Sequence, residues 1–470
     1  MSPGLRALAA LTLAALLGAC ATPVATIAPR DACGQWFEHL DAAVETAGVR
    51  DAQDVRLPGA PFVRVDRLAA ATRADLPWPR WIAHAASLDE RARAAETANL
   101  PATAWPIDGA ADAAAARTRS GACRELALLR LAHDAAAQRA LRDRASVPDH
   151  YATAQRALGA YALLRWPFFA GVQSWQDEHA EAVRQWSVAP PPRQRFAPPD
   201  DVALAPVFEI ERPVGGGALP VHDRFGAPRW PSRDAAAPGV DSAQPVVYVR
   251  QSHTLYRSLW LRQLIYTVWF AERPPRQAVD LLAGRLDGVV VRLTLAPDGT
   301  PVLLDTIHAC GCWHQFYPAP GLALRDGAPT HEEWAFVPAE LPPLAPGQRI
   351  AVRLAAGTHH VTGVAAVAAG AAADRYALRD EDSLRSLPLP GGGARSLYGT
   401  DGLVRGSERA ERFVFWPMGI ASAGAMRQWG HHATAFVGRR HFDDADLIER
   451  RFELPPWNEE GPAKPALVTH

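Results

Sequence analysis

The sequence lacks the features that mark several large protein classes. Its 470 residues carry 49 basic and 50 acidic side chains, so the formal net charge is −1. This balance gives no overall attraction for nucleic acid, and we expect no nucleic-acid partner. The chain contains neither a phosphate-binding loop with the usual Lys-Ser/Thr nor a serine in a nucleophile-elbow context. These absences exclude the simplest motif-based assignments to nucleotide-binding proteins and serine hydrolases.

The longest apolar run at the start of the chain is too short to cross a bilayer. Arg6 precedes the apolar run Ala7–Leu17, and Leu17-Gly18-Ala19-Cys20 follows. This order of basic, apolar and small residues before a cysteine resembles the lipobox of bacterial lipoproteins. The resemblance implies that residues 1–19 are a signal peptide and that Cys20 carries acyl chains such as palmitate.

A lipid anchor at Cys20 predicts where the protein works. Acyl chains bind a membrane by burying methylene groups, at about 0.8 kcal/mol each. We therefore expect the membrane to be one partner and the periplasmic face of the cell envelope to be the location. Ala21, rather than aspartate, follows Cys20. In the sorting rule of enteric-type bacteria this favours the outer membrane over the inner one.

Cysteine is scarce, and its count fits an oxidising compartment. There are five cysteines, and four remain once the lipidated Cys20 is set aside. Cys33 and Cys123 lie in the same helix-rich region, so we predict a disulfide between them. It would close a loop of about 90 residues and contribute on the order of 4 kcal/mol by restricting the unfolded chain.

Residue periodicity predicts an α+β protein with a helical N-terminal domain followed by a mainly antiparallel β domain. The predicted units are a helical domain over 20–188, a proline-rich linker over 189–200, a β-rich domain over 201–455 and a flexible tail over 456–470. Asp31 is expected to cap a helix that buries Trp36, Phe37, Leu40 and Val44.

Short apolar runs beyond the linker predict strands. The two in the middle are joined by Pro297-Asp298-Gly299, a turn signal because proline fixes φ and glycine permits positive φ. A short helix is expected after Asp443 and Asp444, through Glu449. The predicted strands are Val207–Ile210, Val246–Arg250, Leu264–Phe270, Val289–Leu295, Pro301–Ile307, Arg349–Leu354 and Phe413–Trp416.

The densest chemistry lies in His308-Ala309-Cys310-Gly311-Cys312-Trp313-His314. Two thiolates and two imidazoles are the ligand types that suit zinc or copper rather than calcium or magnesium. On an ideal strand all four side chains would face one way, but His308 and His314 would then lie roughly 20 Å apart. One ion could be shared only if the chain bends, and Gly311 permits a bend.

A less demanding site would use both cysteines and one of the two histidines. The fourth position would come from water or from a histidine elsewhere in the chain. Asp287 and Asp305 flank the hairpin that leads into the motif, and could orient a motif histidine as hydrogen-bonding carboxylates. The distant histidine candidates are His253, His331, His359, His360, His431, His432 and His441.

Three interpretations of the motif remain open, and none specifies a reaction or decides whether the protein is an enzyme. The first is a transition-metal site formed by Cys310, Cys312, His308 and His314. The second is a thiol–disulfide redox centre at Cys310 and Cys312, whose small ring would be strained. In the third, the thiols are buried and inert and the histidines are hydrogen-bonded. A disulfide there could also be only a rigid turn, in a non-catalytic envelope scaffold whose helical domain binds a protein partner.

Two longer phrases carry a further resemblance. LDGVVVRLTLAPDGTPVLLDTIHACGCWHQFYP and FVRVDRLAA resemble segments of exported, proteobacterial-type lipoproteins of uncharacterised function. The resemblance supports the lipid anchor and implies no catalytic residues.

Overall fold

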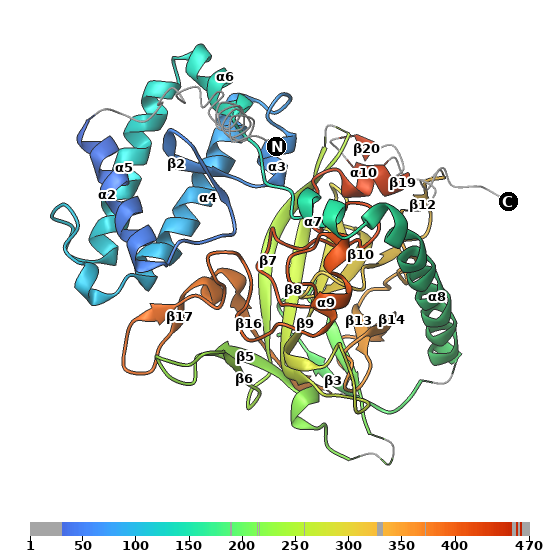
Figure 1. The fold of residues 1–470 in the computed structure, drawn as a ribbon. Helices are drawn as coiled ribbons and strands as arrows, with labels where there is room; N and C mark the ends of the chain where they lie inside the picture. The colour runs from blue at the N-terminus through green and yellow to red at the C-terminus, as the bar shows by residue number, and fades with distance from the viewer. Residues whose placement is uncertain are drawn as a thin grey trace, which may run out of the picture.

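The structure is a computed structural model that describes residues 31–188, 190–213, 215, 217–257, 259–326, 332–371, 373–453, 457–458 and 461–462. The predicted signal peptide and Cys20 lie outside these residues. The fold is α+β, with helices concentrated toward the N-terminus and a strand-rich region after them (Figure 1). None of the helices in the described part of the chain is both long and apolar enough to cross a bilayer.

The first lobe is a small helical unit with its own core. Asp31 caps α2, where its Oδ1 accepts the backbone N–H groups of Cys33 and Gly34 at 3.0 and 3.3 Å. The four apolar residues predicted for this helix are fully buried in a core that extends to Ala145. The elements of the lobe are α2 (Ala32–Ala47), β1 (Val55–Leu57), β2 (Ala60–Val65), α3 (Arg67–Ala71), α4 (Trp78–Asn99), the 3₁₀ turn η1 (Ala102–Ala104), α5 (Ala113–Leu131) and α6 (Ala135–Asp143).

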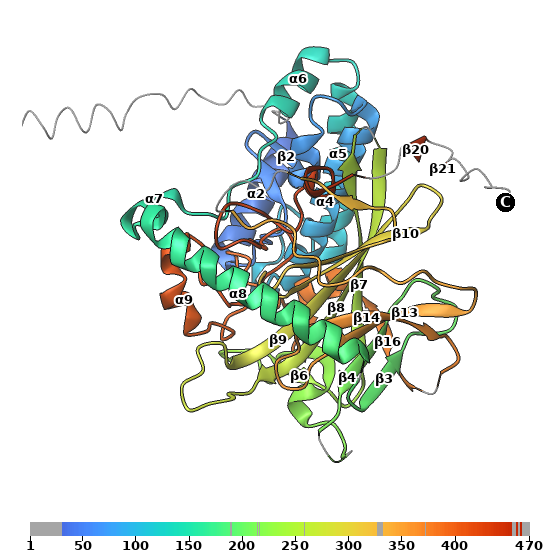
Figure 2. The same cartoon turned by 90° about the vertical axis from the view of Figure 1, so that its right-hand side faces the viewer.

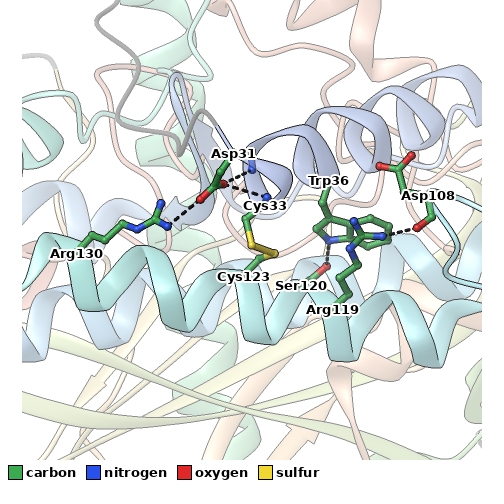
Figure 3. The surroundings of a disulfide bond; sticks show 9 residues. Asp31, Cys33, Trp36, Asp108, Arg119, Ser120, Cys123 and Arg130 are labelled. Atoms are coloured by element: carbon green, nitrogen blue, oxygen red, sulfur yellow. Dashed lines mark hydrogen bonds and ion pairs between the residues drawn. A yellow bond between two sulfur atoms is a disulfide. The ribbon is translucent and has the colours of Figure 1, made fainter.

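A disulfide joins two helices of this lobe. Cys33 of α2 is bonded to Cys123 of α5, 90 residues along the chain, as predicted (Figure 3). On one side of it Arg130 pairs with Asp31 at 2.8 Å, and on the other the Trp36 indole donates to Ser120 at 3.1 Å. The bridge therefore lies within a contact that the two helices already make.

Two further helices belong by their contacts to the strand-rich region. α7 (Thr153–Leu158) contacts η4 (Trp416–Met418), and α8 (Tyr161–Val188) contacts β14 (Val361–Ala368). Only His179 and Val183 of α8 are buried, and Figure 2 shows this helix running across the strands. The sequence grouped 20–188 as one helical domain, whereas the core of the first lobe ends before α7.

The larger sheet has eight strands and is mainly antiparallel. β8 is central, because it pairs with β9 on one edge and with β7 and β5 on the other. β16 joins parallel to β7, and β10 and β11 extend the other side. The strands are β5 (Phe225–Arg229), β6 (Gly239–Asp241), β7 (Val246–Tyr256), β8 (Leu259–Arg273), β9 (Gly284–Leu295), β10 (Pro301–His308), β11 (Gln315–Pro318) and β16 (Ala377–Asp380).

A second sheet of five strands packs against the first. One apolar core contains Phe208 and Val352 from the smaller sheet together with Val268 and Val291 from the larger one. Its order is β14, β13 (Gln348–Leu354), β4 (Val207–Glu211), β3 (Arg193–Ala197) and β15 (Asp374–Arg375). β3 lies within the segment predicted as a linker over 189–200.

The remaining elements are short. The predicted strand Phe413–Trp416 is wrong: the chain there forms α9 and enters η4. The helix predicted after Asp443 begins three residues after Asp444, at Leu447. These elements are η2 (Val221–Asp223), β12 (Ala323–Leu324), η3 (Glu381–Ser386), β17 (Leu387–Pro388), β18 (Ala394–Arg395), α9 (Glu411–Val414), α10 (Leu447–Arg451), β19 (Phe452–Glu453), β20 (Trp457–Asn458) and β21 (Gly461–Pro462).

Polar contacts join the two lobes. Asp51 of the first lobe is buried, and it accepts two hydrogen bonds from Arg385, at 3.0 and 2.7 Å, and one from Gln428, at 2.9 Å. Asn99 donates to the Arg385 carbonyl at 2.7 Å. Arg385 and Gln428, which come late in the sequence, therefore bind the first lobe.

Candidate functional site

The Cys/His motif forms the loop of a hairpin. β10 ends at His308, β11 begins at Gln315, and the register pairs Thr306 with Gln315. Within the loop, the His308 N–H donates to the Cys312 carbonyl at 2.9 Å, and the Gly311 N–H donates to the His308 carbonyl at 2.7 Å. The chain bends at Gly311, the residue that the sequence identified as able to permit a bend.

Gly311 is required by both conformation and space. Its φ is +93°, a region that other residues rarely adopt. A Cβ atom at this position would lie 2.6 Å from the Ala433 carbonyl oxygen. Two residues later Trp313 also has a positive φ, of +62°. The loop is therefore far from an extended strand, and the even spacing of the motif no longer places its side chains on one face.

The two histidines of the motif are held by different carboxylates. His308 Nδ1 lies 3.4 Å from Asp287 Oδ1, and His314 Nε2 lies 2.8 Å from Asp305 Oδ2. Both aspartates are fully buried. The expected role of Asp287 and Asp305 as partners of motif histidines agrees with these contacts, although each takes a separate histidine.

The two thiols lie together. Cys310 and Cys312 are free cysteines with 3% and 8% of their surface exposed, and both belong to one buried apolar cluster. The neighbouring Cys312 thiol, helped by the positive charge of Arg409, lowers the pKa of Cys310. The neighbouring Cys310 thiol, together with burial, raises the pKa of Cys312 well above its usual value. The two thiols therefore differ in pKa, and Cys310 has the lower one.

Asp287 is the centre of a buried polar network. Its Oδ1 accepts from Arg409 at 3.0 Å, and its Oδ2 lies 2.8 Å from His359 Nδ1. Burial alone would raise the pKa of Asp287, but Arg409 and His308 outweigh it and hold the pKa well below its usual range. Asp287 is thus ionised, and it links β9, the motif loop and the β13–β14 turn.

Each motif histidine keeps one ring nitrogen free of protein partners. Among the described residues, neither His308 Nε2 nor His314 Nδ1 has a hydrogen-bond partner, although both are buried. Burial lowers the pKa of both rings, that of His314 to about 3. The rings are therefore neutral, with one nitrogen oriented by a carboxylate and the other available.

Three of the distant histidines lie near the motif. His359 binds Asp287, and the His360 ring lies 5.3 Å from that of His308. His432 is buried beside Gly311, and neither of its ring nitrogens has a hydrogen-bond partner within the described residues. His431 binds the Ala52 carbonyl at 2.7 Å, and His253 packs on Trp260. His331 lies outside the described residues. Within the part of the chain that is described, no three Cys, His, Asp or Glu side chains gather closely enough to hold a metal ion.

Sequence analysis missed the residues that the C-terminal segment brings to the loop. Arg427 donates from Nε to the Cys310 carbonyl at 3.0 Å, and Arg409 supplies the charge beside the thiols. Burial raises the pKa of the neighbouring Glu411 to about 7. All three follow the motif by about a hundred residues, in a segment with little regular structure, so no periodicity indicated them.

Comparison with known proteins provides no functional assignment, so a proposal for the function rests on the geometry of the site. No family model matches the sequence, and neither a curated protein nor a solved structure matches it.

Proposed function

We propose that this is a lipid-anchored protein of the cell envelope in which Cys310 and Cys312 form a thiol–disulfide redox centre. The observation that supports it best is a tight, buried loop that carries two free thiols with opposite pKa shifts. The lipobox at Cys20 supports the anchor and the periplasmic location. The Cys33–Cys123 disulfide fits an oxidising compartment.

The chemistry follows from the unequal thiols. In the oxidised form, the thiolate of a partner protein attacks the Cys312 sulfur, and Cys310 leaves as a thiolate because a thiol of lower pKa is the better leaving group. A second partner thiolate then attacks the mixed disulfide and expels Cys312, which takes up a proton. The partner gains a disulfide, and the loop gains the two electrons.

The short loop determines the direction in which electrons are transferred. A disulfide between cysteines separated by one residue closes a small, strained ring, and strain makes a disulfide easier to reduce. The oxidised loop is therefore an electron acceptor. Because both thiols are nearly enclosed, a protein partner reaches them only when the loop opens.

A metal centre is the second candidate. Soft thiolates suit zinc or copper, and a histidine that binds a metal usually has its other nitrogen on a carboxylate. His308 and His314 both have that arrangement, with the second nitrogen free. Cys310 and Cys312 would hold the ion, with His308 or His314 as a further ligand, and the ion would supply Lewis-acid or redox chemistry.

Thiol titration of protein extracted from the envelope in detergent separates the candidates. A redox centre isolated in its oxidised form releases two thiols with reductant beyond those of Cys33 and Cys123. The Cys310→Ser/Cys312→Ser variant provides that baseline. A metal centre gives two thiols that react only after chelation, together with zinc or copper in elemental analysis that the variant lacks.

A third outcome would reject both candidates. If the two thiols react only on unfolding, no metal is present and equilibration with glutathione never closes the disulfide, the scaffold interpretation remains. The anchor is tested separately: labelled palmitate should enter the wild-type protein and not the Cys20→Ala variant.

A further inference from the structure

A cavity of about 360 Å³ lies between α8 and the strand-rich region, beside the motif loop. Proteins bind small molecules in cavities of roughly 300–1,000 Å³ with mostly apolar walls and a few polar groups. Gly171 and Trp175 of α8 line one side, and Trp313 of the loop lines another. The thiols do not line the cavity, but Trp313 and Phe436 of its lining pack against the apolar cluster that contains Cys310 and Cys312.

Its walls are aromatic. The rings of Trp175 and Trp313 lie 4.4 Å apart, and those of Phe415 and Phe436 stack at 4.0 Å. Phe168 lies 5.5 Å from Phe415. Flat apolar surfaces held in this way fit a ligand that is itself flat and apolar.

Two polar atoms of the lining, Glu333 Oε2 and His314 Nδ1, make no hydrogen bond within the described residues. His314 Nε2 donates to Asp305, so its Nδ1 is an acceptor as well. The carboxylate of Glu333, which is 7% exposed, uses Oε1 to accept the backbone N–H groups of Phe436 and Val437 at 2.6 and 2.9 Å. Its Oε2 lies 3.7 Å from Arg440, too far for a hydrogen bond, and makes none within the described residues.

The neighbouring guanidinium of Arg440 already makes hydrogen bonds within the protein. Arg440 donates to the Thr434 hydroxyl at 3.0 Å and to the Thr434 and Trp334 carbonyls at 2.8 Å each. It therefore offers little to an anionic ligand, whereas Glu333 Oε2 is a free acceptor in apolar surroundings. A ligand that fits must bring a hydrogen-bond donor.

The geometry points to a binding site for a flat apolar molecule that carries one N–H or O–H donor, with its body between Trp175 and Phe436 and its donor on Glu333 Oε2. This inference does not depend on the thiol chemistry. It assigns α8 a role as the wall of a ligand site.

Two fluorescent probes test the site. N-phenyl-1-naphthylamine has an aromatic body and one N–H donor, whereas 1-phenylnaphthalene lacks the donor. We expect the protein to bind the amine with one-to-one stoichiometry and about tenfold more tightly than the hydrocarbon, because one hydrogen bond in apolar surroundings contributes about one decade in affinity.

Filling the cavity should abolish binding. A Cβ atom on Gly171 would meet nothing within 4 Å, so the backbone accepts Gly171→Leu at its Cβ, and the added side chain stands on the cavity lining. We expect it to weaken binding of both probes at least tenfold. Gly121 in α5 has the same open surroundings far from the cavity, and Gly121→Leu should leave binding unchanged.

The hydrogen bond from the ligand to Glu333 Oε2 is tested by a separate substitution. Glu333→Gln keeps the shape and the Oε1 acceptor but replaces Oε2 with a donor group. It should reduce affinity for the amine to that of the hydrocarbon and leave the hydrocarbon unaffected. Binding that survives Gly171→Leu would overturn the site, since the probes would then be held by exposed apolar side chains. Equal affinity of wild-type protein for both probes would overturn the role of Glu333.

Discussion

Single residues determine how the motif loop is held. Asp287 faces Arg409, His308 and His359 in the interior, and Asp305 faces Arg292 and His314. A buried carboxylate is tolerated only while its partners remain, because an uncompensated charge in the interior is costly. The two aspartates therefore fix the orientation of both motif histidines.

Removing the charge of Asp287 should destabilise the protein strongly. Asp287→Asn leaves Arg409 buried without its carboxylate, and the expected loss is roughly 3–5 kcal/mol in the free energy of unfolding. Urea denaturation measures this loss. Asp177→Asn, on the exposed face of α8, is the control and should change the value by less than about 0.5 kcal/mol.

Gly311 should tolerate no side chain. Gly311→Ala combines an unfavourable φ with a contact between Cβ and the Ala433 carbonyl, and we expect a loss of about 1–3 kcal/mol. The helical Gly121→Ala should instead be neutral or stabilising by up to about 1 kcal/mol. If both variants melt at the wild-type temperature, the bend described for the loop is wrong.

The sequence predicted the members of this site better than their arrangement. It indicated the bend at Gly311 and the two aspartates, because each lies close to the motif along the chain. His308 and His314 turn to separate carboxylates in a loop where Trp313 has a positive φ, which tryptophan rarely adopts and no pattern indicates. Arg409 and Arg427 come from far along the chain, and only the tertiary fold brings them in.

At the scale of elements, apolar patterning predicted strands well and short aromatic runs badly. Val289–Leu295 and Pro301–Ile307 form β9 and β10, joined by a turn in which Gly299 has φ +86°. Phe413–Trp416 is as apolar as a strand but forms a helical turn, because a run of four residues fits either structure. Its side chains are largely exposed rather than part of a sheet.

The helix α8 buries only two of its residues, His179 and Val183. Val183 is 2% exposed and packs near Gly363 of β14. Val183→Asp buries a charge at this contact, so we expect α8 to detach and the chain near 189–200 to become sensitive to protease. Limited proteolysis followed by mass spectrometry detects the cut. Val188→Asp, at a position 87% exposed, should be cut at the wild-type rate.

At the scale of the whole molecule, buried histidines make stability depend on pH. Burial lowers the pKa of His432 to about 3. The unfolded chain binds a proton at this histidine near pH ~6.5, and the folded protein does not until far lower pH. Stability from His432 is therefore present above pH ~6.5 and lost as the pH falls toward 3, at about 1.4 kcal/mol per pH unit.

The variant His432→Phe isolates this contribution. Between about pH 6 and pH 4, wild-type protein should lose about 1.4 kcal/mol per pH unit relative to the variant, measured by denaturant unfolding at each pH. Parallel stability curves would show that His432 is protonated in the folded state.

The contacts of Asp51 have a consequence for biosynthesis. The first lobe has its own core and disulfide, yet the Asp51 carboxylate is hydrogen-bonded to Arg385 and Gln428, which lie 334 and 377 residues further along the chain. A chain synthesised from its N-terminus can complete the lobe early, but these hydrogen bonds form only after residue 428 has followed. A truncation before Arg385 should therefore yield a folded lobe in which the Asp51 carboxylate has lost both partners.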